Sequence, residues 1–203
     1  SDDEIHLRRA VGKVIELEKT LRDYPVKGNT GIAHTRWATH GVPSEKNAHP
    51  HISSSVAVVC NGIIENHEEL RQNQIKLGYT FNSDTDTEVV VNQITHYMES
   101  GRALFDAMRD TVQMLEGAFA LGVVSKDEPN RLVGSRRGSP LVVGIGDGEA
   151  YLASDMSALI NFTSDFIVLN DGDVVEIDHG AVRITDELGN PVEREVHKST
   201  LSA

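Results

Sequence analysis

A change of pattern near Gly117 constrains the fold of this chain more than any other feature. Before that residue, apolar side chains recur at helical spacing. After it, short apolar runs separated by turn sequences are typical of antiparallel hairpins. Because helices and strands are grouped rather than alternating, the sequence predicts a layered α+β fold. We expect helices within 11–25, 66–78, 85–101 and 104–115, and strands at 118–124, 132–134, 141–145, 150–153, 166–169, 174–177 and 182–184.

Composition narrows the choice of partners and compartment. The chain has 203 residues, a net charge of −12 and a pI near 5.1. This acidity argues against nucleic acid and against an anionic membrane as partners. No apolar run is long enough to span a bilayer. Cys60 is the only cysteine, which excludes an internal disulfide and predicts a reducing, cytoplasmic setting.

An apolar, β-branched run at 56–60 predicts a buried strand ahead of the helical block. It is followed by Asn61-Gly62, a pair that commonly marks a tight turn with positive φ. Cys60 ends the run, where a free thiol is usually a small buried hydrophobe rather than a nucleophile. Asn66 then has the character of a helix N-cap.

The segment 34–51 has neither helical nor strand periodicity, so we expect an irregular loop. It holds Trp37, the only tryptophan, together with four of the nine histidines. Arg36 is suited to binding a carboxylate or phosphate through two parallel hydrogen bonds. One interpretation is a binding surface held on a scaffold. The other is an ordered surface loop whose histidines and tryptophan only pack.

A second polar cluster, S-D-T-D-T-E at 83–88, precedes a helix. Thr85 and Glu88 have the spacing of a capping box, in which each side chain would bond a backbone N–H of the other. A calcium loop would need glycine where Val89 stands, so that match fails. No histidine pair has the H-E-x-x-H spacing and no second cysteine is present, so we expect no metal site and no cofactor.

Four segments together carry a resemblance to a known family: H-T-R-W-A-T-H-G at 34–41, N-A-H-P-H at 47–51, N-G-I-I-E-N-H at 61–67 and S-D-T-D-T-E at 83–88. The chain resembles the glutaminase (type 2 glutamine amidotransferase) domain of glucosamine-6-phosphate synthase from about Leu7 to Glu195. Amidophosphoribosyltransferase and asparagine synthetase resemble it less well.

This resemblance implies a four-layer αββα sandwich of the N-terminal-nucleophile hydrolase type. It implies that Arg36 pairs with the α-carboxylate of L-glutamine and that Asp86 receives its α-ammonium group. Asn61, through its side-chain amide, and Gly62, through its backbone N–H, would form the oxyanion hole. The loop that closes over the substrate would contain Trp37, Thr39 and His40.

The resemblance also reveals a departure. The family's nucleophile is an N-terminal cysteine whose α-amino group serves as the base. This chain starts with acidic residues at Ser1–Glu4, so that cysteine, the first strand and the following helix are expected to be missing. We therefore expect an incomplete glutaminase domain at 1–195. Residues 196–203 would begin a linker to an absent sugar-phosphate isomerase domain.

The function implied is glutamine hydrolysis that supplies ammonia for converting fructose 6-phosphate to glucosamine 6-phosphate. The partners would be L-glutamine and the isomerase domain of the same parent chain, and a homodimer of the full-length protein is allowed. Two alternatives stay open: a non-catalytic glutamine-binding or regulatory module, and the glutaminase domain of another amidotransferase. A metal-binding domain that uses the histidine loop is a third, weaker option.

Overall fold

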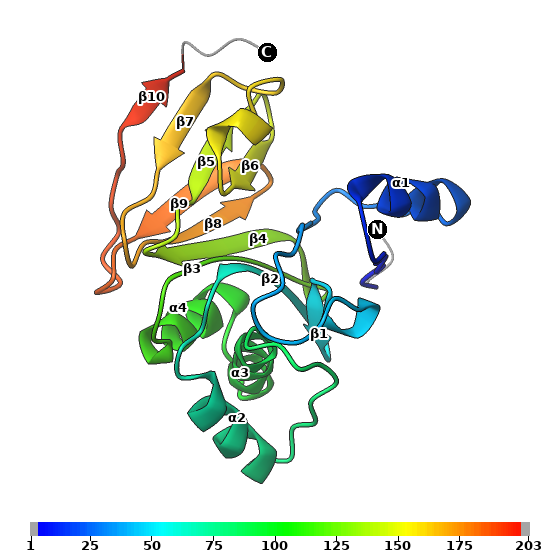
Figure 1. The fold of residues 1–203 in the computed structure, drawn as a ribbon. Coiled ribbons are helices and arrows are strands. Elements are labelled where there is room, and N and C mark those ends of the chain that lie inside the picture. Colours follow the sequence, from blue (N-terminus) through cyan, green and yellow to red (C-terminus); the bar gives the residue numbers. More distant parts are fainter. Residues whose placement is uncertain (1–3, 200–203) are drawn as a thin grey trace.

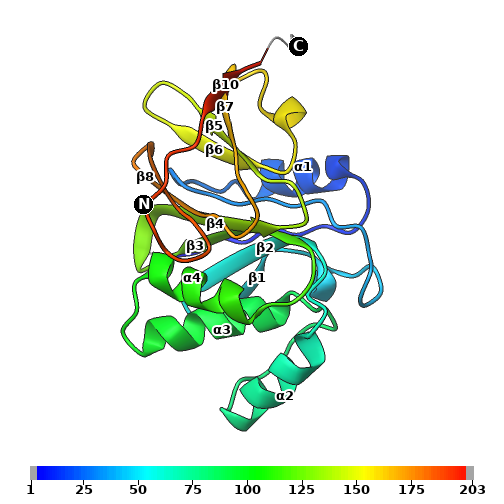
Figure 2. The same ribbon diagram turned by 90° about the vertical axis from the view of Figure 1, so that its left-hand side faces the viewer.

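The computed structural model describes residues 4–199 and arranges most of them in three layers (Figure 1). Three helices cover one face of a six-stranded sheet, and a four-stranded sheet covers its other face, as Figure 2 shows from the side. The three helices are α2 (His67–Lys76), α3 (Glu88–Glu99) and α4 (Leu104–Met114). Two of our expectations, the acidic start at Ser1–Glu4 and the linker at 196–203, include residues outside the described range.

All strand pairs in both sheets are antiparallel. The larger sheet has the order β1-β2-β3-β4-β8-β9. Its strands are β1 (His51–Ser53), β2 (Val56–Gly62), β3 (Phe119–Ser125), β4 (Glu128–Arg137), β8 (Val174–Asp178) and β9 (Ala181–Thr185). The smaller sheet has the order β10-β7-β5-β6, with β5 (Val142–Ile145), β6 (Ala150–Ala153), β7 (Asp165–Val168) and β10 (Val196–Lys198).

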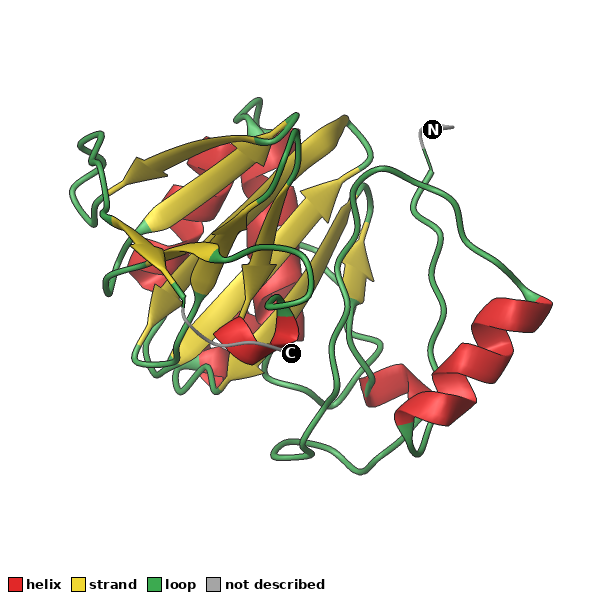
Figure 3. Ribbon diagram, turned by 90° about the horizontal axis from the view of Figure 1, so that it is seen from above, coloured by secondary structure: helices red, strands yellow, loops and turns green. Residues whose placement is uncertain are grey.

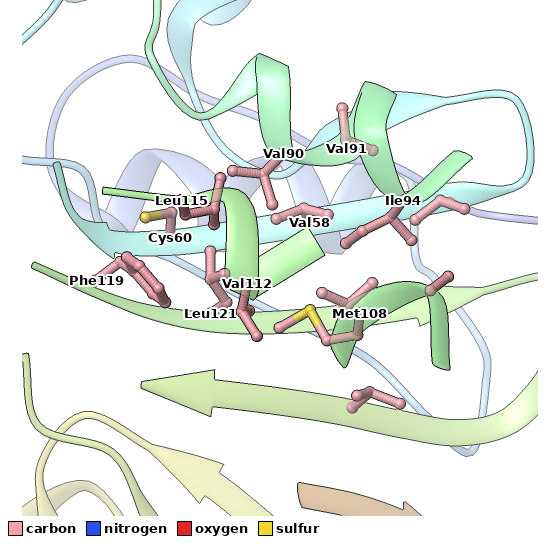
Figure 4. Close-up of a cluster of buried hydrophobic side chains, with 14 of the residues drawn as sticks. Val58, Cys60, Val90, Val91, Ile94, Met108, Val112, Leu115, Phe119 and Leu121 are labelled. Atoms are coloured by element: carbon pink, nitrogen blue, oxygen red, sulfur yellow. The ribbon is translucent and has the colours of Figure 1, made fainter. Parts of the chain in front are cut away.

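Alternation along the strands sorts side chains between two cores. On β3, Phe119 and Leu121 point into the core beneath the helices, whereas Ala120 belongs to the core between the sheets. Figure 4 shows the first core, in which Val58 and Cys60 of β2 meet side chains of α3 and α4. Because neighbouring strand residues face opposite ways, a register slip of one residue would exchange the two cores.

The predicted fold class, the four predicted helices and the predicted strands, which correspond to β2 to β9, are confirmed. The outer face of the smaller sheet packs on the segment of the short 3-10 helix η2 (Met156–Ala158), so residues 4–199 show no helical layer there. The sequence did not reveal β1 and β10, each only three residues long. Since β10 pairs with β7, residues 196–198, which we expected to begin a linker, extend the sheet.

The N-terminal arm, residues 4–25, stands apart from the layers. Its helix α1 (Val14–Asp23) has no buried residue, and Figure 3 shows it to one side of the sheets. Two apolar side chains of the arm, Val11 and Val14, are more than half exposed. Within residues 4–199, no helix is both long and apolar enough to cross a bilayer.

Candidate functional site

The site is centred on the carboxylate of Asp86, which is only 3% exposed. One of its oxygens, Oδ2, accepts a hydrogen bond of 2.7 Å from the backbone N–H of Ile64. Ile64 follows the end of β2 by two residues, so this bond fixes the carboxylate beside Asn61 and Gly62. Both of these residues are exposed. A buried anion is therefore held next to an accessible strand end.

Gly62 can only be glycine in this backbone. Its φ is +141°, and an added Cβ would lie 2.1 Å from the carbonyl oxygen of Ala118. The residue is still paired, opposite Phe119, as the last member of β2. Our expectation of a tight turn at Asn61-Gly62 was wrong, although the positive φ at the glycine was correct. The close approach of β3, rather than a turn, requires the missing side chain.

Asn47 joins the loop 34–51 to the loop that carries Asp86. It is completely buried. Its Oδ1 accepts the N–H of Asp84 at 2.9 Å, and its Nδ2 donates to Asp84 Oδ2 at 3.2 Å and to the carbonyl of Val42 at 2.9 Å. Lys46 adds an ion pair with Asp84 at 2.8 Å. Two segments almost 40 residues apart are thus held side by side.

Arg36 shapes its own loop. Its Nη2 donates to the carbonyl oxygens of His40 and, at 3.0 Å, of Gly41. This brings His40 near the buried anion, because His40 Nδ1 lies 3.8 Å from Asp86 Oδ1. The Arg36 side chain is half-buried, and its guanidinium has further N–H donors that these two hydrogen bonds do not use. Arg36 is therefore linked to the carboxylate of Asp86 through His40, whose carbonyl accepts from Arg36 and whose ring lies beside Asp86.

The other predicted loop residues differ in their surroundings. Trp37 is 90% exposed and Thr39 is also exposed. Such an exposed tryptophan is unusual for a side chain that only packs. His40 is partly buried and meets the ring of His67 edge-on, with centroids 4.9 Å apart. Of the predicted site residues, the structure brings His40, Asn61 and Gly62 close to Asp86. Arg36 is bonded to the carbonyl of His40. Trp37 and Thr39 are open to solvent.

Three histidines at the two ends of the segment 34–51 pack together as a cluster. The rings of His34 and His49 stack at 4.3 Å, and those of His49 and His51 meet at 4.9 Å. His49 Nδ1 accepts the N–H of Cys60, and His51 Nε2 lies 2.8 Å from Thr85 Oγ1. For these histidines the packing interpretation holds. Across residues 4–199, no group of three or more His, Cys, Asp or Glu side chains is placed to hold a metal ion.

Burial keeps this histidine cluster neutral. It lowers the pKa of His49 to about 2 and that of His51 to about 3, and the positive charge of Arg36 lowers both further. Arg9 has the same effect on both rings. The positive charge in this region therefore resides on arginine rather than on imidazole.

The capping box expected at Thr85 and Glu88 was wrong. The helix α3 starts at Glu88, whose carboxylate accepts the N–H groups of Asn82 and Ser83 at 2.7 Å each and the hydroxyl of Ser83. Thr85 instead contacts His51 and Ser83. Glu88 thus stabilises the loop before the helix, because a buried carboxylate needs several donors.

Cys60 is buried beneath the helices, as predicted. Burial raises the pKa of its thiol to about 12, and the nearby charge of Asp86 raises it further. A thiol in this environment stays protonated and is a poor nucleophile. Asn47 is the residue that sequence reasoning missed. It lies within the segment N-A-H-P-H, but a single polar loop residue gives no periodic signal of burial.

The sequence of this chain is similar to those of known proteins. A family model described as a glutamine amidotransferase domain matches residues 20–179. The chain is 54% identical over 193 residues to glutamine–fructose-6-phosphate aminotransferase (isomerizing) of Pseudomonas putida and 50% identical over 201 residues to that of Vibrio cholerae. These alignments cover 95% and 99% of this chain but 32% and 33% of the relatives. The chain therefore spans about a third of their length.

Solved structures share the fold. Glutamine phosphoribosylpyrophosphate amidotransferase from B. subtilis matches with a TM-score of 0.63 at 25% identity, over 76% of this chain and 34% of that one. The allosteric regulatory enzyme of purine biosynthesis matches with a TM-score of 0.60 at 24% identity, over 71% and 32%. The predicted sandwich of the N-terminal-nucleophile hydrolase type is thereby confirmed.

We predict that the histidine cluster makes stability fall in acid. The unfolded chain binds protons at imidazole near pH 6.5, whereas folded His51 resists protonation down to about pH 3. Its contribution is therefore complete above about pH 6.5 and is lost as the pH falls towards 3. His51→Gln keeps a polar atom near the Nε2 position but does not titrate. Urea denaturation between pH 7 and pH 4 gives the free energy of unfolding of both proteins. This free energy should fall less with decreasing pH in the variant than in the wild type, and an equal fall in both would contradict the assignment.

Proposed function

The chain belongs to the glutamine amidotransferase family, and from that premise we propose that it holds the glutamine-hydrolysing site of a longer enzyme. The curated relatives, named glutamine–fructose-6-phosphate aminotransferase, support a more specific proposal. The full protein would use ammonia released from L-glutamine to convert fructose 6-phosphate to glucosamine 6-phosphate. A second domain of the same protein, beyond the described residues, would bind the sugar phosphate.

One observation carries the proposal. The buried carboxylate of Asp86 lies beside the accessible end of β2, and the loop that places His40 against it is held by Arg36. A free amino acid carries one cationic and one anionic group on the same carbon. A site for it needs one fixed anion and one fixed cation, and Asp86 and Arg36 fulfil these requirements.

The strand end suits the chemistry of amide hydrolysis. The reaction passes through a tetrahedral intermediate with a negative oxygen, which neutral donors stabilise when they are fixed in advance. In our proposal the side-chain amide of Asn61 and the N–H of Gly62 are those donors. The pairing of Gly62 with Phe119 of β3 fixes the position of this backbone. The exposed Trp37 and Thr39, with His40, would close over the bound amino acid.

We assign the nucleophile to a part of the protein outside residues 4–199. Cys60 is excluded because its thiol is buried against the helices and stays protonated. The family resemblance implies a cysteine at a chain start, with its α-amino group as the base. The roles of this chain in the reaction are therefore to bind glutamine, to orient its amide and to stabilise the oxyanion.

The oxyanion role of Asn61 predicts a loss of turnover in the full-length enzyme. Asn61→Ala removes one donor that acts mainly in the transition state, so kcat for glutamine hydrolysis should fall by roughly 10²–10³-fold with little change in KM. Asn73→Ala, an exposed change on α2, is the control and should have no effect. Unchanged kcat for Asn61→Ala would remove this residue from the oxyanion hole.

The role of Arg36 predicts a loss of recognition instead. Arg36→Ala leaves the glutamine carboxylate without its cation, which should weaken apparent glutamine affinity by about 2–5 kcal/mol. Arg36→Lys keeps the charge but loses the paired donors, so its affinity should lie between those of wild type and the alanine variant. Initial rates against glutamine concentration give the comparison. Near-normal affinity in Arg36→Ala would refute the assignment.

A further inference from the structure

A cavity adjoins the loop 34–51, which from here on is called the Arg36 loop. This cavity of about 650 Å³ separates the N-terminal arm from the Arg36 loop. Its lining contains four cationic side chains, and among the described residues no aspartate or glutamate lines it. The four cations are Arg8, Arg9, Lys13 and Arg36. In a protein with a net charge of −12, this concentration of positive charge needs an explanation.

The pairing of arginines makes the cavity more unusual. Among residues 4–199, eight of the twelve arginines form an ion pair with a carboxylate. The four that form none are Arg8, Arg9, Arg36 and Arg71, and the first three all line this cavity. Unpaired arginines are therefore concentrated at one place rather than scattered over the surface.

These three arginines bond to backbone carbonyls. Arg8 donates to Tyr24 and Leu7, Arg9 to Pro50, and Arg36 to its own loop. Carbonyl oxygens hold the guanidinium groups in position but do not neutralise them. Each guanidinium has five N–H donors, so donors remain for a ligand. Glu88 and Glu45 are near enough to attract Arg9, but neither forms an ion pair with it, and Glu88 is already bonded to three donors of residues 82–83.

Unsatisfied polar atoms occur on the same lining. Arg9 Nε, His34 Nδ1 and Ser44 Oγ are buried and have no hydrogen-bond partner, and all three residues line the cavity. Buried polar groups normally have partners, because an unpaired one destabilises the fold. Three such atoms on one lining show that the described residues leave polar groups without partners around this cavity.

We propose that this cavity binds a dianionic ligand, a phosphate monoester or a dicarboxylate, between the N-terminal arm and the Arg36 loop. Several unpaired cations match a charge of −2 better than a single carboxylate. The rest of the lining includes Val11, Val14 and Pro43, which would contact the carbon body of the ligand. The volume is within the usual range for small-molecule sites, about 300–1,000 Å³.

The cavity is distinct from the proposed glutamine site. Asp86, Asn61 and Gly62 do not line it, and Arg36 is the one charged residue common to both. A dianion that engages Arg36 would oppose binding of the glutamine carboxylate to the same side chain. Binding of the two ligands should therefore be negatively coupled, and the coupling is reciprocal. The cavity itself does not depend on the proposed function, whereas this coupling does.

The test is calorimetric titration of the full-length protein with inorganic phosphate and, separately, with succinate. Succinate is chosen as the dicarboxylate because it has no ammonium group that could bind Asp86 in the proposed glutamine site. Arg9→Gln should weaken binding at one site by about tenfold or more, because a charge-assisted hydrogen bond is lost. Lys13→Gln, an exposed change on the same lining, should weaken it in the same direction and serves if Arg9→Gln does not fold. Arg22→Gln removes an equal charge from α1 outside the cavity and is the control.

The outcomes separate the possibilities. A site lost in the lining variants but kept in Arg22→Gln supports the proposal, and the tighter probe identifies the head group. The absence of any site that the lining variants weaken would overturn the proposal. Equal weakening in Arg22→Gln would also overturn it, because the effect would then be general electrostatics. Glutamine hydrolysis is measured on the same samples. If hydrolysis is normal and the lining variants weaken no site, only this inference fails. If the lining variants weaken a site but the protein does not hydrolyse glutamine, only the proposed function fails.

Discussion

The hydrogen bonds of Asn47 are the interaction on which the rest of the site depends. They join the Arg36 loop to the loop 83–86, and Asp86 then reaches the amide of Ile64 beside the end of β2. A neutral hydrogen bond contributes about 1 kcal/mol, but leaving these buried partners unpaired would destabilise the fold by more. Asn47 ends the short 3-10 helix η1 (Glu45–Asn47), whereas residues 83–86 form no helix or strand. A few buried polar contacts therefore fix the distance between a cation and an anion.

Electrostatics divide the molecule into regions with different roles. Most arginines neutralise neighbouring carboxylates, which suits an acidic surface. Around the loop 34–51 the histidines are kept neutral by burial, and arginine charge is left unpaired. A cation that is permanently charged and held by backbone carbonyls can recognise an anion over a wide pH range. The Arg36 loop thus lies between two proposed anion-recognising surfaces, one for an amino acid and one for a dianion.

The sequence predicted what depends on periodicity and failed where contacts are long-range. The strands around Leu121 and Val175 were recognisable because their apolar runs fill buried layers. The strand β10 was missed because its three residues are exposed and pair only at an edge. Asn61-Gly62 was misjudged because the same glycine freedom that suits a turn also admits a neighbouring strand. Asn47 gave no signal, since its partners lie almost 40 residues away. Resemblance, not pattern, assigned the site residues.

The central claim is that Arg36 and Asp86 hold the two ends of one amino acid. The most direct test is a crystal structure of the full-length protein with L-glutamate bound. The account predicts the α-carboxylate on the Arg36 guanidinium and the α-ammonium on Asp86, with the side chain directed towards Asn61 and Gly62. Glutamate bound elsewhere, or with its α-carboxylate in the cationic cavity and Asp86 uninvolved, would contradict it.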